Sequence, residues 1–112
     1  MTKTIRTAVV AGLVRTREFL KKGWTQGWFA KTASGRDCGA ESSDASCWCL
    51  SGALQRAFQD ESSSEAEDRA ASSLRWTIRR KSIADWNDAK RRTQTQVVGA
   101  VTRTIARLRR RK

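Results

Sequence analysis

The stretch Cys47-Trp48-Cys49-Leu50-Ser51-Gly52-Ala53-Leu54 lies near the middle of the chain and is the only place where Trp, Cys and Gly residues crowd together. Acidic and serine-rich segments flank it on both sides. With its continuation to Phe58, it repeats apolar residues at helical spacing. We therefore predict a buried central helix, capped by Ser43, Asp44 or Ser46, on which the other helices pack. Its predicted buried stripe consists of Cys47, Leu50, Ala53, Leu54, Ala57 and Phe58, with Trp48 beside it.

A chain of 112 residues fits one domain, because two separate cores would each bury too little apolar surface. Hydrophobic residues make up 38% of the chain, so the core is small, and the five Trp side chains must supply much of it. We predict one helical domain over residues 1–108, followed by a basic C-terminal tail over residues 109–112.

The N-terminal segment begins with basic residues and an apolar patch. Arg15, Arg17 and Glu18 interrupt this patch before it reaches the length of a signal peptide, and no run of 18 apolar residues occurs in the sequence. We therefore expect a soluble, cytoplasmic protein without a membrane partner. In that compartment the three Cys residues would not form a disulfide framework.

Three further helices are predicted from apolar periodicity and capping residues. The first begins after Thr2 or Thr4 and ends at Gly23, which suits a helix C-terminus. The next begins at the capping-box pattern Ser64-Glu65-Ala66-Glu67, and the last begins at a second such pattern, Thr93-Gln94-Thr95-Gln96. The predicted apolar stripes of these three helices are Ile5, Ala8, Val9, Leu13, Val14 and Leu20; Ala66, Ala70, Leu74 and Ile78; and Val97, Val98, Val101, Ile105 and Leu108.

Two segments before the central helix are less regular. Residues 24–30 fit either a helical turn or a strand, since seven residues are too few for periodicity to distinguish the two. Residues 31–43 are rich in Ser, Gly and Asp and are predicted to be a loop. The predicted fold is all-α: a small bundle of about four helices with a Trp-rich core, in which Trp24, Trp28, Trp48 and Trp86 meet around Gly52 and Ala53.

Residues with catalytic or metal-binding chemistry are few. The sequence contains no His, which is the commonest general base and metal ligand. Cys38, Cys47 and Cys49 lack the paired short spacings and the fourth ligand of a structural zinc site, and in a helix Cys47 and Cys49 would point about 160° apart. We therefore predict buried structural thiols and neither a metal nor another cofactor.

The segment Trp86-Asn87-Asp88 has two interpretations. In the structural one, Trp86 fills the core while Asn87 and Asp88 form hydrogen bonds with nearby backbone groups. In the functional one, Asp85 and Asp88 lie beside a Trp-lined pocket that raises a carboxyl pKa for acid–base chemistry. Because no partner base or phosphate-binding glycine pattern accompanies them, the structural interpretation is favoured and no enzyme is predicted.

The net charge is +12, and eight of the 11 acidic residues fall between residues 37 and 68. This balance favours a polyanionic partner, although basic helix faces can also simply keep a small protein in solution. In a folded bundle the C-terminal basic clusters would form one surface around the Trp86 turn, which would bind phosphates by charge neutralisation and counterion release. Only Gln94 and Gln96 resemble base-reading residues, so sequence-specific recognition is not predicted. The predicted nucleic-acid-binding residues are Arg79, Arg80, Lys81, Lys90, Arg91, Arg92, Arg103, Arg107, Arg109, Arg110, Arg111 and Lys112.

Three segments carry a resemblance: Trp24-Thr25-Gln26-Gly27, the stretch at residues 47–54, and Ile83-Ala84-Asp85-Trp86-Asn87-Asp88. Together they resemble an uncharacterised family of small bacterial and phage proteins with W-x-x-G, W-C-x-x-G-A-L and W-N-D landmarks and a Thr-capped final helix, which Thr93 and Val97 fit. The resemblance implies one folded domain and brings no established activity. The motif residues, as they are called below, are Trp24, Gly27, Trp48, Cys49, Gly52, Ala53, Trp86, Asn87 and Asp88.

The leading functional expectation is a non-enzymatic binding or accessory protein that contacts nucleic acid, or an acidic protein surface, without sequence specificity. The first alternative is a protein-interaction adaptor or inhibitor that uses residues 31–46. The resemblance would place such a protein in a phage, plasmid or host-defence setting. The second alternative is an enzyme that uses Asp85, Asn87 and Asp88.

Overall fold

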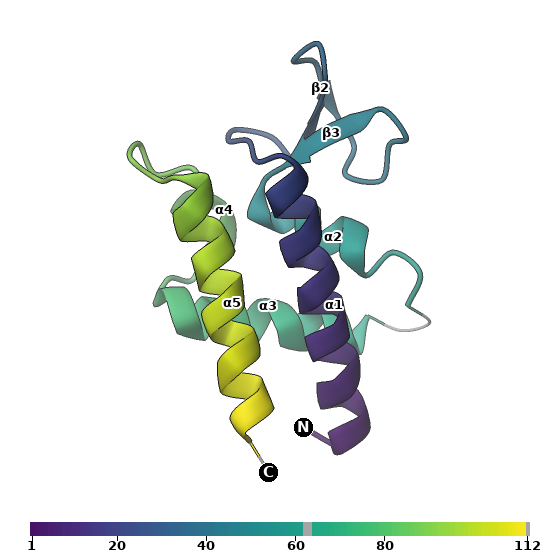
Figure 1. The fold of residues 1–112 in the computed structure, drawn as a ribbon, viewed down its shortest axis with the longest axis vertical. Coiled ribbons are helices and arrows are strands. Elements are labelled where there is room, and N and C mark those ends of the chain that lie inside the picture. Colours follow the sequence, from purple (N-terminus) through teal and green to yellow (C-terminus); the bar gives the residue numbers. More distant parts are fainter. Residues whose placement is uncertain (62–63, 112) are drawn as a thin grey trace.

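The computed structural model describes residues 1–61 and 64–111, and in these residues it contains five helices and a three-stranded antiparallel sheet (Figure 1). The all-α prediction is therefore wrong, because the sheet makes the fold a mixed α/β one. In chain order, the elements are α1 (Lys3–Lys22), β1 (Ala30–Thr32), β2 (Asp37–Cys38), β3 (Ala45–Trp48), α2 (Leu50–Ala57), α3 (Glu65–Ile78), α4 (Ile83–Asn87) and α5 (Gln94–Arg110).

Helix α1 is the central element of the helical part, since it packs against α2, α3 and α5. The Thr2 side chain accepts a hydrogen bond from the Ile5 amide, and the helix ends at Gly23, as predicted. Its buried residues include Val9, Leu13 and Leu20. None of the helices in residues 1–61 and 64–111 is both long and apolar enough to cross a bilayer.

Helix α5 runs beside α1 in the opposite direction, and α3 crosses behind the pair (Figure 1). The capping box at Thr93 and Gln96 forms as predicted, whereas the Ser64 side chain makes no capping hydrogen bond to α3. The buried stripe of α3 is the predicted one. Helix α5 continues to Arg110, so Arg109 and Arg110 belong to its last turn and not to a separate tail, and Lys112 lies outside the described residues.

The sheet occupies the region that the sequence predicted to be a loop and the start of the central helix. Its strand order is β2-β1-β3, with Ala30 opposite Cys38 on one side and opposite Trp48 on the other. Residues 45–48 are therefore a strand, and α2 begins only at Leu50. A short apolar run fits either the period of a helix or that of a strand. Here the pairing of residues 45–48 with β1 makes them a strand.

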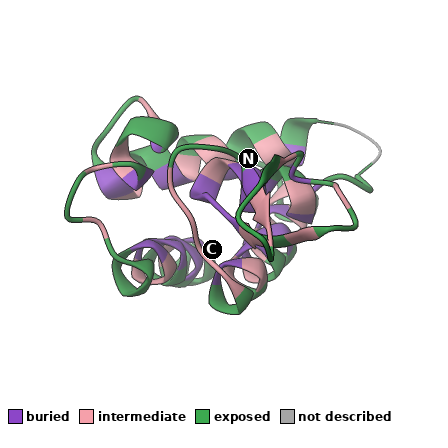
Figure 2. Ribbon diagram, turned by 90° about the horizontal axis from the view of Figure 1, so that it is seen from above, coloured by how far each residue is buried: buried purple, intermediate pink, exposed green. Residues whose placement is uncertain are grey.

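The tryptophans do not meet around Gly52 and Ala53. Trp48 is buried with its ring centroid 5.0 Å from that of Phe19, whereas Trp28 is 48% exposed and Trp86 is half-buried. The core is mainly aliphatic and lies where the helices face one another (Figure 2). At Gly52, a Cβ atom would collide with the backbone carbonyl of Phe29, which explains why glycine is needed inside α2.

We predict that Gly52→Ala lowers the free energy of unfolding by about 1–3 kcal/mol, because its Cβ overlaps a backbone group that cannot rotate away. Gly99→Ala in α5 is the matched control. Its Cβ would meet only the flexible Arg103 guanidinium at 3.4 Å, so the gain in helix propensity should stabilise the protein by up to about 1 kcal/mol. Urea denaturation of both variants measures the two effects, and equal changes would contradict this account of Gly52.

Candidate functional site

Two of the motif residues, Trp24 and Asp88, form hydrogen bonds with the buried side chain of a third, Asn87, which ends α4. Its Oδ1 accepts hydrogen bonds from the Trp24 indole N–H at 2.8 Å and from the Leu50 amide at 3.1 Å. Its Nδ2 donates to the Thr25 carbonyl at 3.2 Å and to Asp88 Oδ1 at 2.9 Å. Both acceptor positions and both donor hydrogens of the amide are therefore used within the fold.

Two further side chains attach residues 24–27 to α4. Asp88 Oδ1 also accepts a hydrogen bond from the Gly27 amide at 3.0 Å. Gln26 Nε2 donates to the carbonyls of Asn87 and Ala89 at 2.9 and 3.0 Å. Gly27 has a φ of +87°, a conformation that favours glycine and brings its amide to Asp88. We call this set of contacts around Asn87 and Asp88 the Asn87 network.

Of the three thiols predicted to be buried, only that of Cys49 is, whereas those of Cys38 and Cys47 are half-buried. Cys38 and Cys47 are on the strands, whereas Cys49 is the N-cap of α2 and its Sγ accepts a hydrogen bond from the Gly52 amide at 3.3 Å. Burial raises the pKa of the Cys49 thiol, and the charge of Asp88 adds to this effect. The thiol is therefore neutral at pH 7, which does not suit a nucleophile.

A small hollow of about 130 Å³ lies beside the Asn87 network, lined by residues that include Trp28, Cys49, Ser51 and Asp88. It is smaller than the roughly 300–1,000 Å³ of typical small-molecule sites. Among the residues that the structure describes, no group of three or more Cys, Asp or Glu side chains is arranged to hold a metal ion.

The predicted basic residues do not form one surface around Trp86. Lys90 and Arg91 precede α5 and Arg109–Arg111 end it, and a 17-residue helix separates these groups by about 25 Å. Arg92 has a local role: its Nε donates to the Trp86 carbonyl at 2.9 Å, and its guanidinium lies 4.0 Å from the centroid of the Trp86 ring.

A different arrangement joins the end of α3 to the second half of α5. Arg107 donates to the Thr77 hydroxyl at 2.7 Å and to the Ser73 carbonyl at 2.9 Å. Its guanidinium lies 4.3 Å from the centroid of the Trp76 ring, and that of Arg79 lies 4.9 Å from the same centroid. Trp76 is nevertheless 59% exposed. Helical spacing on α5 adds further arginines, and we call the set the α3–α5 basic surface: Trp76, Arg79, Arg103, Arg107, Arg110 and Arg111.

The positive charges of this surface are close enough to affect one another. The pKa of Arg107 is lowered, mainly by burial and further by the charges of Arg111 and Arg110. Arg79 adopts a left-handed conformation, with a φ of +58°, at the C-terminus of α3, a position that glycine usually occupies. The chain thus places an arginine where glycine would be less strained.

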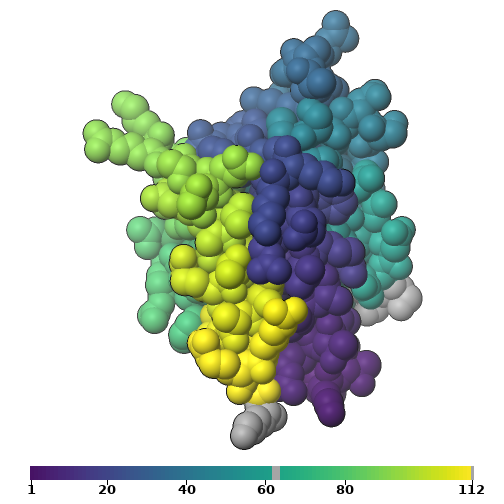
Figure 3. Space-filling model, in the orientation of Figure 1, coloured from purple at the N-terminus to yellow at the C-terminus, as the bar shows by residue number. Residues whose placement is uncertain are grey.

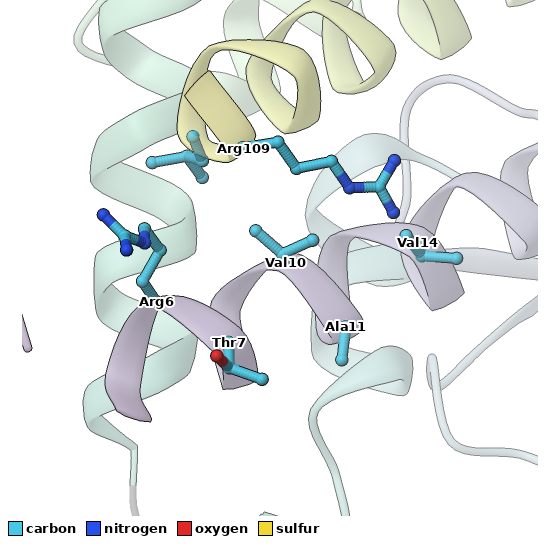
Figure 4. Close-up of a pocket in the computed structure, with 7 residues that line it drawn as sticks. Arg6, Thr7, Val10, Ala11, Val14 and Arg109 are labelled. Atoms are coloured by element: carbon cyan, nitrogen blue, oxygen red, sulfur yellow. The ribbon is translucent and has the colours of Figure 1, made fainter. Parts of the chain in front are cut away.

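Helices α1 and α5 lie side by side (Figure 3), and a shallow apolar groove is lined by residues 6–14 of α1 and by the last turn of α5. It measures about 470 Å³ and is lined by residues that include Val10, Val14 and Leu108. Figure 4 shows the Arg109 side chain extending across the groove above Val10, with Arg6 on the neighbouring turn.

Comparison with protein families identifies a match over residues 5–107 to a family of unknown function, DUF6197. The chain belongs to the DUF6197 family. Comparison with characterised proteins and with solved structures finds no match.

Trp76 is not among the binding residues that the sequence of this DUF6197 protein predicts. The helical pattern already distinguishes Trp76. It is two residues after Leu74, and at 100° per residue this places it about 200° around the helix from the buried stripe of α3. A large apolar residue on the polar face of an amphipathic helix, next to arginines, is a candidate binding residue.

We predict that Asn87→Ala lowers the free energy of unfolding by about 3 kcal/mol, because the Leu50 amide and the Trp24 indole N–H each lose their acceptor. Asp85→Ala, on an exposed position of α4, is the control and should change stability by less than about 1 kcal/mol. Chemical denaturation followed by Trp fluorescence measures both. Similar stability of the two variants would show that the Asn87 network is not needed to hold these segments.

Proposed function

We propose that this protein is a non-enzymatic nucleic-acid-binding protein that contacts phosphates through the α3–α5 basic surface, without reading base sequence. The observation that carries the proposal is the convergence of Arg79 and Arg107 on Trp76, with Arg110 and Arg111 close to Arg107. Two helices thereby present several guanidinium groups on one surface, and Arg is the side chain best suited to bind phosphate oxygens in a bidentate manner.

The scarcity of acidic residues in the part of the sequence that forms the α3–α5 basic surface supports this proposal. From Arg69 to Lys112, the sequence contains only two acidic residues, Asp85 and Asp88, and Asp88 is engaged in the Asn87 network. Three ion pairs occur within the described part of the chain: Arg15–Glu61, Glu18–Lys21 and Glu65–Arg69. None of these ion pairs includes a residue of the α3–α5 basic surface, so its charges are available to an external anion.

The two side chains that resemble base-reading residues, Gln94 and Gln96, have other roles in the structure. Gln96 completes the capping box of α5, and Gln94 Nε2 donates to the Leu20 carbonyl at 2.7 Å. The surface itself presents arginines and one indole, which suit phosphates and base faces better than a particular pattern of base edges. The proposed binding is therefore non-specific and strongly dependent on salt.

We predict that a triple variant, Arg79→Gly, Arg103→Ser and Arg110→Ser, weakens nucleic-acid binding and makes it less sensitive to salt. Loss of three phosphate contacts should reduce the slope of log K against log[salt] by about 2 for single-stranded DNA and by about 3 for duplex DNA. Glycine is chosen at position 79 because it accepts the positive φ, so the fold should keep its stability within about 1 kcal/mol. Fluorescence anisotropy of labelled duplex and single-stranded DNA, between roughly 50 and 200 mM salt, measures the binding.

The control is Lys22→Ser, Lys31→Ser and Arg36→Ser, which removes the same number of positive charges near the sheet. It should retain the wild-type slope. Equal weakening by both variants would show that only net charge matters, and absence of binding at 50 mM salt would contradict the proposal.

One observation favours a protein-interaction function as a second candidate, at residues 28–29 and not at the residues 31–46 that the sequence assigned to an adaptor. Trp28 and Phe29 are 48% and 46% exposed, and their rings pack edge to face at 5.8 Å, which is typical of residues at protein interfaces. An apolar interface of this kind would show little salt dependence, so the same titration distinguishes the two candidates. The enzyme alternative has less support, because the Asn87 amide is fully hydrogen-bonded and the Cys49 thiol is neutral.

A further inference from the structure

We infer that the α3–α5 basic surface binds single-stranded nucleic acid in particular, and that Trp76 is the platform on which a base stacks. This inference rests on the proposed function and adds to it the class of nucleic acid. Trp76 has the most exposed large hydrophobic side chain in the described residues, at 59%. Its neighbours Ser73 and Thr77 face α5, so the indole stands at the edge of the interface between the two helices.

The indole is held in place by Arg107, whose own position is determined by α3. Two hydrogen bonds, to the Thr77 hydroxyl and the Ser73 carbonyl, hold the Arg107 guanidinium 4.3 Å from the ring centroid. The Thr77 hydroxyl is itself 2.6 Å from the Thr104 hydroxyl of α5. An aromatic ring that is oriented before the ligand arrives loses less conformational entropy on binding.

Arg79 has a different role from Arg107. Its guanidinium contacts the same indole at 4.9 Å, but Arg79 is exposed and forms no ion pair within residues 1–61 and 64–111. The long Arg79 side chain is therefore free to leave the ring and bind a phosphate while a base takes its place against the indole. Arg103 and Arg110 lie along α5 on the same surface and would contact the following phosphates.

A stacking platform favours a single strand over a duplex. In a duplex each base is already stacked between its neighbours, so a surface indole has no base face to contact unless the helix is opened. In a single strand every base has an accessible π-face, and stacking on an aromatic side chain adds affinity without requiring a particular base. Basic side chains beside an exposed aromatic residue are the features that non-specific single-strand-binding proteins combine.

The test compares single strands that have the same backbone charge with and without bases, together with a duplex that carries about twice that charge. Binding of the full chain to four 20-residue probes is measured by anisotropy at about 100 mM salt: single-stranded dT, single-stranded rU, an abasic strand and a duplex. We expect wild-type protein to bind the dT and rU strands roughly tenfold more tightly than the abasic strand. Trp76→Ala should remove this difference while leaving affinity for the abasic strand unchanged, and Trp76→Phe should keep part of it.

Trp28→Ala is the matched control, since it removes another half-exposed indole that has no Arg or Lys side chain against it in the described residues. It should bind all four probes like wild type.

If wild-type protein binds all four probes equally, or if Trp76→Ala weakens binding to the abasic strand as much as to dT, the stacking inference is wrong and the phosphate-binding proposal stands. If none of the probes binds, both are wrong. Because thymine carries a methyl group that uracil lacks, a dU strand serves as the sugar control: a preference for rU over dU would assign the ligand to RNA, and the reverse would assign it to DNA.

Discussion

The amide of Asn87 joins three segments that are far apart in the sequence: residues 24–25, the start of α2 and the end of α4. Because the side chain is completely buried, each of its hydrogen bonds is made in a low-dielectric environment, and each lost partner would leave an unpaired buried group. The contact with the Leu50 amide is also a second cap for α2, in addition to that of Cys49. This one side chain therefore fixes the start of α2 to residues 24–25 and to α4, in addition to the packing of α2 against α1.

A second constraint determines the surface that we propose to bind nucleic acid. Arg107 of α5 is hydrogen-bonded to the backbone and to a side chain of α3, which brings the arginines of both helices to the same indole. This surface is distinct from the Asn87 network, in which four of the motif residues, Trp24, Gly27, Asn87 and Asp88, form hydrogen bonds within the fold. The molecule thus separates the residues that stabilise its structure from those available to a partner. Such a separation allows surface arginines to change with little effect on stability.

The sequence was a good guide to the helices and a poor guide to the sheet. Helices α1, α3 and α5 were predictable because their apolar residues recur over at least 14 residues, and caps at Thr2 and Thr93 mark two of their starts. The strands have only two to four residues, and the pairing of β1 with β3 depends on backbone hydrogen bonds between residues as far apart in the sequence as Ala30 and Trp48. The partners of Asn87 could not be predicted for the same reason. Trp76, in contrast, was detectable as an apolar residue outside the buried stripe of its helix.

The most direct test of the account is an NMR titration of isotope-labelled protein with a single-stranded dT oligonucleotide. The central claim is that the ligand contacts the α3–α5 basic surface and leaves the Asn87 network unchanged. We expect the largest shifts in the Trp76 indole N–H and in the backbone amides at the end of α3 and in the second half of α5, with the Trp24 indole N–H and the Leu50 amide unaffected. Shifts centred on residues 24–27 and α4, or on the groove between α1 and α5, would contradict the claim.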